Sequence, residues 1–172
     1  MTDKLKVVTF QHKAVVDELN EKGFYLCTYK GDFHEATPKS YQYLIDSYRT
    51  KYPNTHIKYP IFGWTQVLEV GLPVNEHNKE DLERMLGMTG FKEPYHIITL
   101  SVPKNKVMET DFYDFVYLRC SEEFLEEDPP LTESQIANIL RPRERGAIEI
   151  QAILGYIDRD WVVDIRPLPE LL

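Results

Sequence analysis

Two pairs of polar side chains are spaced so that a β-strand would carry both members of each pair on one face. Trp64 and Gln66 are two residues apart, as are Glu149 and Gln151, and side chains alternate along a strand with a period of two. An indole beside a carboxamide suits a flat ring such as nicotinamide or a nucleobase. A core tryptophan beside an exposed glutamine explains the first pair as well, and a solvent-facing edge explains the second.

Two further segments could bind an anion. Thr9 and Gln11 close the first predicted strand and open the first predicted helix, where free backbone N–H groups attract negative charge. Helix capping is the alternative role for both. The segment "RPRER" contains Arg141, Arg143 and Arg145, and the planar guanidinium group suits phosphate. Arg145 is our phosphate-binding candidate, and a solvated turn is the alternative.

The motifs of the enzyme classes that sequence reveals most readily are missing. The chain has no glycine-rich nucleotide loop, no H-E-x-x-H and no G-x-S-x-G. Cys27 and Cys120 lack the short Cys/His spacings of zinc sites, and the five histidines are widely dispersed. We therefore expect no metal site and two reduced thiols. Asp111 is expected to cap a helix or to anchor a turn.

Composition predicts an ordinary globular protein. The chain has 172 residues, of which 42% are hydrophobic, which fits one domain over residues 1–172. A net charge of −8 disfavours generic nucleic-acid binding. Because there is no N-terminal apolar run with a cleavage site and no apolar stretch near 20 residues, we expect a cytoplasmic protein that does not bind or span a membrane.

The N-terminal half predicts strands alternating with helices. Residues 5–10 are β-branched and apolar, and the helical pattern that follows ends at Gly23. Residues 24–29 are expected to be extended. Thr37 and Pro38 are expected to cap and start a helix, and Gly63 interrupts the next strand, where a bulge or a close ligand approach is plausible.

The C-terminal half predicts the rest of an α+β fold. Residues 79–87 are expected to form a helix, 95–102 a central strand, and 148–154 and 161–168 two late strands. Thr132 with Gln135 forms a capping-box pattern, whereas the period of residues 106–118 does not separate helix from strand. Because the strands are short and do not alternate regularly with helices, we predict a small mixed sheet flanked by helices.

Several segments together resemble an uncharacterised bacterial family, domain of unknown function 3841. They are "VVTFQ", "PIFGWTQ", "VPKNKVMETDF" and "IQAILGYIDRDWVVDI", in that order and across most of the chain. The chain departs from the family pattern at Val8 and at Phe115, where tryptophan is usual. This resemblance implies no assigned function.

The succession of elements is also similar to ADP-ribosyltransferases of the DNA-modifying toxin type. In that family the first strand and helix help to hold NAD, and a late Gln-Ala-Glu strand carries the catalytic glutamate. Gln151 and Ala152 match this strand, but Ile153 stands at the glutamate position. An isoleucine can neither accept a proton nor balance developing positive charge, and Glu149 is about 13 Å away along a strand.

These patterns lead to three functional hypotheses. The first is a non-catalytic or weakly catalytic module that binds a nucleotide or related small molecule in an ADP-ribosyltransferase-like cleft. The second is an active NAD-dependent transferase with a rearranged site around Thr9, Gln11, Trp64, Gln151 and the catalytic candidate Glu149. The third is an adaptor that binds a protein partner through its acidic surface.

Overall fold

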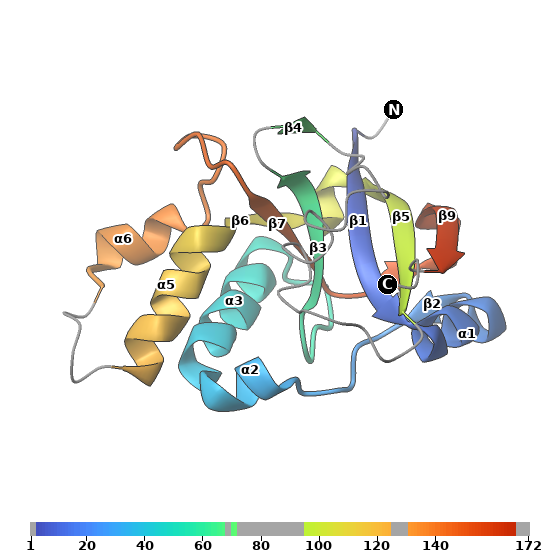
Figure 1. Ribbon diagram of the computed structural model, residues 1–172, viewed down its shortest axis with the longest axis horizontal. Helices are drawn as coiled ribbons and strands as arrows, with labels where there is room; N and C mark the ends of the chain where they lie inside the picture. Colours follow the sequence, from blue (N-terminus) through green and yellow to red (C-terminus); the bar gives the residue numbers. More distant parts are fainter. Residues whose placement is uncertain (1–2, 68–69, 72–94, 125–130, 168–172) are drawn as a thin grey trace, which may run out of the picture.

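The computed structural model describes residues 3–67, 70–71, 95–124 and 131–167. Its main sheet has seven strands in the order β6-β7-β3-β1-β5-β9, with β4 paired to β3 (Figure 1). These strands are β1 (Lys4–His12), β3 (Ile61–Val67), β4 (Val70–Gly71), β5 (Tyr95–Pro103), β6 (Met108–Asp111), β7 (Ile150–Leu154) and β9 (Val162–Pro167). A second, two-stranded sheet pairs β2 (Phe24–Tyr25) with β8 (Ile157–Asp158).

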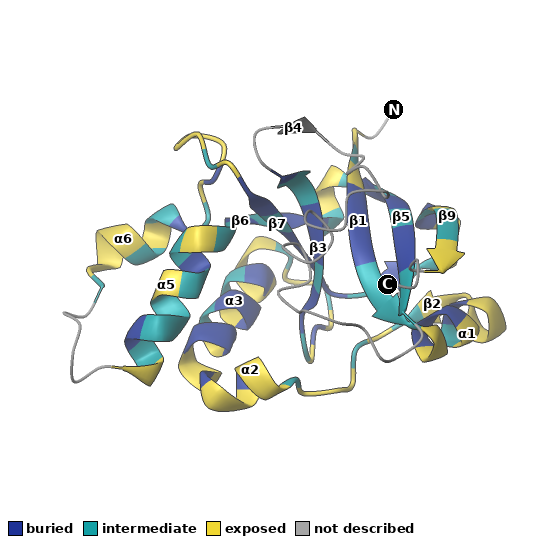
Figure 2. Ribbon diagram, viewed as in Figure 1, coloured by how far each residue is buried: buried dark blue, intermediate teal, exposed yellow. Residues whose placement is uncertain are grey.

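Helices cover both faces of the main sheet. They are α1 (Lys13–Lys22), α2 (Asp32–Ala36), α3 (Pro38–Lys51), α5 (Phe112–Glu123) and α6 (Glu133–Asn138), with 3-10 turns at Lys104–Lys106 and Arg159–Trp161. In Figure 1, α2, α3, α5 and α6 lie together at one end and α1 lies at the other. Figure 2 shows that α1 and α3 each bury one side and expose the other.

The predicted α+β class is confirmed. The expected mixture of strand directions is wrong, because every pairing between described strands is antiparallel.

Cross-strand register assigns side chains to the two faces. Val7, Ile98 and Leu100 pack with Val16 and Leu19 of α1, and we call this side the α1 face. On the other side, the α3 face, Met108 and Ile153 of the sheet pack with residues of α3 and α5 such as Leu44, Ile45 and Phe115. Each face therefore has its own hydrophobic core, as expected for a sheet with alternating side chains.

The first predicted strand and helix are confirmed. The β-branched run of β1 is buried between β3 and β5. Helix α1 ends at Gly23, whose φ of 80° is left-handed and whose N–H donates to the carbonyl of Leu19. Glycine tolerates this conformation because it has no Cβ. The extended segment expected over residues 24–29 shortens to Phe24–Tyr25.

The start of α3 differs from the prediction at one residue. Pro38 begins the helix as expected, but Thr37 makes no side-chain capping bond, because its hydroxyl donates to the carbonyl of Phe33 at 2.7 Å. The Glu122 carboxylate of α5 accepts bonds from the N–H groups of Lys39 and Ser40, at 2.8 and 2.7 Å, and from the Ser40 hydroxyl. A residue more than 80 positions away in the sequence thus caps the helix.

The undecided segment 106–118 contains both kinds of structure. It leaves a 3-10 turn, forms edge strand β6 and enters α5 at Phe112. The Asp111 side chain accepts a bond from the N–H of Asp114 at 3.1 Å, so its predicted capping role is confirmed. The Thr132–Gln135 capping box of α6 is also present.

Gly63 allows a close approach, but to protein rather than to a ligand. A Cβ atom there would lie 2.5 Å from Cγ1 of Val7 and 3.1 Å from the carbonyl oxygen of Val8. The register shift in β3 lies further along, between Trp64 and Gln66.

The helix predicted over residues 79–87 falls outside the described residues. Within the described segments, no helix has the length and apolar character needed to cross a membrane.

Candidate functional site

A cleft of about 420 Å³ opens on the α3 face, between the sheet and helices α2, α3 and α5. Strands β1, β3 and β7 form its floor, and the helices form its walls. Seven aromatic side chains line it, and we call it the aromatic cleft: Phe10, Phe33, Tyr41, Phe62, Trp64, Phe112 and Phe115. The remaining lining residues are Val116, Arg119 and Gln151. A cavity of this size with few polar groups is typical of small-molecule sites.

Arg119 of α5 supplies the positive charge of the aromatic cleft. Its guanidinium carbon lies 4.2 Å from the ring centroid of Phe33 and 6.0 Å from that of Tyr41, which is cation–π geometry. Its Nε is buried and has no hydrogen-bond partner among the described residues. Burial raises the pKa of Tyr41, an effect that the nearby Arg119 charge partly opposes. Arg119 therefore brings a positive charge to the wall of the aromatic cleft, together with a buried donor that no described residue pairs.

Trp64 and Gln151 meet in the floor of the cleft. They are direct cross-strand partners of β3 and β7, and both line the cavity. Trp64 is only 4% exposed and contacts Phe112 edge-on, with ring centroids 5.0 Å apart. Oε1 of Gln151 is buried without a hydrogen-bond partner in the described part of the chain. A buried unpaired polar atom is costly, so a ligand donor would stabilise this position.

Thr9 and Gln11 lie on the α1 face, away from the aromatic cleft. Thr9 is fully buried opposite Ile98, which belongs to the core beneath α1. Its hydroxyl donates to the carbonyl of Phe62 at 2.7 Å, and the Gln11 amide donates to the Thr9 hydroxyl at 2.8 Å. Neither residue lines the cleft. The N-terminus of α1 is capped by His12, whose Nδ1 accepts from the N–H of Ala14.

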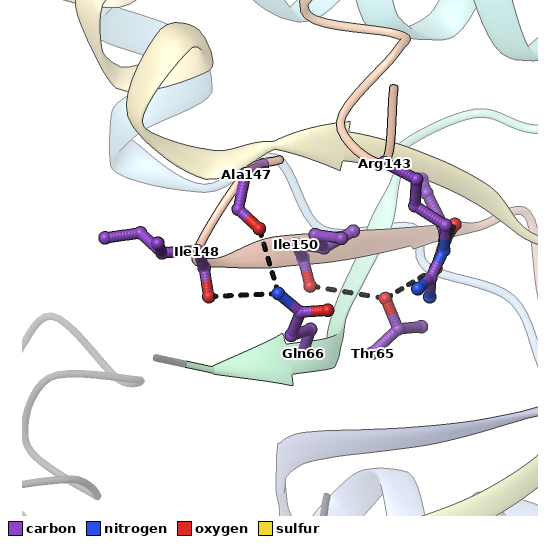
Figure 3. A network of polar contacts seen from close by, with 7 residues as sticks. Thr65, Gln66, Arg143, Ala147, Ile148 and Ile150 are labelled. Atoms are coloured by element: carbon purple, nitrogen blue, oxygen red, sulfur yellow. Dashed lines mark hydrogen bonds and ion pairs between the residues drawn. The ribbon is translucent and has the colours of Figure 1, made fainter. Parts of the chain in front are cut away.

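Gln66 has a structural contact. Its Nε2 donates to the carbonyls of Ala147 at 2.8 Å and Ile148 at 3.5 Å, which fastens the segment before β7 to the end of β3 (Figure 3). The register shift after Trp64 separates the two members of this predicted pair. Gln66 therefore holds the loop beside the site, whereas Trp64 lines the site.

The remaining predicted residues do not line the aromatic cleft. Arg145 forms an ion pair with Asp114 at 3.1 Å. Burial and the nearby Asp111 raise the pKa of Asp114, and Arg145 lowers it. Glu149 is 1% exposed, and its carbonyl accepts from the N–H of Phe112 at 3.2 Å. Its side chain is not among the groups that line the cavity.

Sequence reasoning missed Arg119 and most of the aromatic residues. The segment "DFYDFVYLRC" is apolar around most of its circumference, so its helical period is weak. With α5 unassigned, nothing placed Arg119 on the face that contacts the sheet. The signal that could have located Arg119 was Asp111. Asp is a preferred helix cap, and no glycine or proline interrupts the chain between Asp111 and Arg119, which together indicate a helix that begins after Asp111.

Two further findings concern metal binding and the cysteines. Among the described residues, no cluster of histidine, cysteine and carboxylate side chains could hold a metal ion. Cys27 and Cys120 are both free thiols.

No protein-family model, no curated protein and no solved structure matches this chain.

Proposed function

We propose that the protein binds a small molecule that combines a flat ring with an anionic group, as a nucleotide does, in the aromatic cleft. The observation that carries this proposal is the position of Arg119, a cation that lines an aromatic cavity and whose buried Nε has no hydrogen-bond partner among the described residues. Because burying such a donor without a partner costs free energy, the site is built for an acceptor that the described chain does not supply.

The ring-binding part of the proposal rests on the rigid walls of the cleft. Aromatic side chains pack against planar ligands in offset or edge-on arrangements. The ring contacts fall into two groups: Trp64 contacts Phe112, and Tyr41, Phe62 and Phe115 contact one another. Gln151 adds a carboxamide, which can distinguish rings by the hydrogen-bonding groups at their edges.

The anion-binding part rests on the charge of Arg119. A guanidinium group binds carboxylate and phosphate oxygens through a planar set of donors. Because Phe33 and Tyr41 stack near the group, its orientation is restricted before a ligand arrives. Such preorganisation lowers the entropic cost of binding.

We propose binding rather than ADP-ribosyl transfer as the activity. Ile153, at the position of the transferase glutamate, is fully buried in the core of the α3 face with Met108 and Phe115. None of the described residues that line the cleft is a carboxylate. A transferase-like cleft that has kept its ring-binding walls fits these residues, and NAD or ADP-ribose is then one ligand of the proposed class.

The test is a thermal-shift titration with AMP, ADP, NAD and ADP-ribose, and with adenosine as the uncharged comparison. A ligand at one hundred times its dissociation constant stabilises the folded state by about 2.7 kcal/mol. We expect at least one charged ligand to raise the melting temperature and adenosine to do so less. Arg119→Met should remove the difference, while Arg119→Lys should keep part of it.

Arg159→Met is the matched control. Arg159 is exposed and its Nε donates to Asn20 of α1 at 3.2 Å, away from the cleft. This variant loses the same charge and should bind like the wild type. The proposal is wrong if no ligand of the panel stabilises the protein, or if Arg119→Met binds as tightly as Arg159→Met.

A further inference from the structure

A second cleft, of about 600 Å³, lies beside edge strand β6. Glu109 of β6 lines it and is the cross-strand partner of Ala152 in the core of the α1 face. Thr110, the next residue, pairs with Gln151 in the floor of the aromatic cleft. Because neighbouring side chains of a strand point to opposite faces, Glu109 and Thr110 point away from each other, and the two clefts share no lining residue.

The second cleft is lined by four basic side chains, and we call it the basic cleft. Lys51 comes from the end of α3, Lys104 from the turn after β5, and Arg141 and Arg143 from the segment before β7. The acidic lining residues are Glu109 and Glu144. Four positive and two negative side chains give a local surplus of positive charge in a chain whose net charge is −8.

Arg143 is fixed in this cleft by Glu109. Its Nε donates to one carboxylate oxygen at 2.7 Å and an Nη donates to the other at 2.6 Å. The Thr65 hydroxyl also donates to Glu109, at 2.7 Å, and Figure 3 shows Thr65 and Arg143 approaching each other beside β7. This bidentate contact leaves part of the guanidinium group available and holds its plane in one orientation.

Lys51 and Arg141 provide the charge that is not neutralised. Both are exposed, and neither forms an ion pair with a carboxylate in the described segments. Lys104 contacts Asp3 at 3.2 Å, but the two side chains are 53% and 79% exposed, so water screens that pair. A ligand that brings several negative charges into this cleft would meet cations from three separate segments of the chain.

We propose that the basic cleft is a second binding site, for a compact polyphosphate: a small molecule with two or three linked phosphate groups. Linked phosphates place several negative charges within one cavity, which matches cations that converge from different elements. An extended nucleic-acid backbone fits less well, because its remaining length would lie along an acidic surface that repels it. The site is independent of the ligand proposed for the aromatic cleft.

The experiment is isothermal titration calorimetry of the full chain with sodium triphosphate, at low salt and again near physiological ionic strength. We expect saturable binding, weakened by added salt because part of the site is exposed. The double variant Lys51→Ala/Arg141→Ala should bind at least about tenfold more weakly, since it removes two charged partners of the phosphates. Both side chains are exposed, so the variant should fold normally, which circular dichroism can verify.

Two controls separate a local site from bulk charge and from the aromatic cleft. Arg145→Ala/Lys13→Ala removes the same net charge from positions paired with Asp114 and Asp17, outside the basic cleft, and should leave triphosphate affinity unchanged. Arg119→Met should also leave it unchanged. Equal weakening in both double variants overturns the site, as does absence of saturable binding. Tighter binding of a short single-stranded oligonucleotide than of triphosphate overturns the assignment to a compact ligand.

Discussion

The two faces of the main sheet are covered by side chains of different shapes. On the α1 face, aliphatic residues of β1 and β5 meet aliphatic residues of α1, and the absence of a side chain at Gly63 lets Val7 approach β3 closely. On the α3 face, aromatic rings come from both the sheet and the helices, and a cavity of about 420 Å³ remains among them. Arg119 and Gln151 line this cavity, and each has a buried polar atom without a hydrogen-bond partner among the described residues.

This difference shows how one sheet can combine stability with binding. Branched aliphatic side chains interdigitate and fill space at close to crystalline density. Rigid rings with few rotatable bonds leave gaps when several meet edge-on, and such gaps accept a flat ligand. The α1 face is therefore expected to contribute mainly to folding, and the wall of the aromatic cleft mainly to binding.

The largest effect that would test this comparison is the loss of a large side chain from each face. Leu100 is fully buried on the α1 face, whereas Phe33 in the cleft wall is 62% exposed. We expect Leu100→Ala to lower the free energy of unfolding by about 2–5 kcal/mol. Phe33→Ala, which loses an exposed cation–π contact, should lower it by about 0.5–1 kcal/mol. Urea denaturation measures both, and equal losses would contradict the division between the faces.

A smaller effect is expected where the helices of the α3 face are joined by a carboxylate. Glu122→Gln retains shape but cannot accept all three hydrogen bonds from Lys39 and Ser40, so we expect a loss of about 0.5–2 kcal/mol at neutral pH. Burial opposes the ionisation of Glu122, but the bonds from the Ser40 hydroxyl and the two N–H groups outweigh it and lower its pKa below 4.5.

The pH dependence of that loss provides a second measurement. Because the pKa of Glu122 is lower in the folded state, its stabilisation is complete above the unfolded value near 4.5 and is lost as the pH falls through the folded value. The difference in unfolding free energy between wild type and Glu122→Gln should therefore shrink on acidification below about pH 4.5. A difference that stays constant down to pH 2 would exclude the ionised carboxylate as its source.

The smallest effect concerns a residue that sequence placed in the binding site. The Gln11 amide donates to Thr9 on the α1 face, and a hydrogen bond of this kind contributes about 0.5–1.5 kcal/mol. Gln11→Ala should cost no more than that in stability and should leave ligand affinity unchanged, whereas Gln151→Leu should reduce affinity. Calorimetry with the best ligand of the nucleotide panel compares the two variants directly. Loss of binding in Gln11→Ala would mean that the site extends across the sheet.

Local sequence was sufficient wherever neighbouring residues settle the backbone. Gly23 ends α1 as predicted, because its conformational freedom acts within one residue. The side-chain oxygen of Asp111 also acts locally, as the cap of α5, although sequence left helix and strand open for the residues that follow it. The capping box at Thr132 is of the same kind. Thr37 failed as a cap because its hydroxyl had a competing acceptor in Phe33 and because Glu122 was available from a distant helix.

Sequence by itself thus determined the α+β class, the first strand and helix, and two residues of the aromatic cleft, Trp64 and Gln151. Only the tertiary structure decided which candidates share a site. Strand pairing places Trp64 directly beside Gln151, and the alternation of β1 turns Thr9 to the opposite face. The packing of α5 then adds Arg119. The physical reason is that register and helix docking depend on contacts between residues far apart in the chain, which spacing along one segment cannot encode.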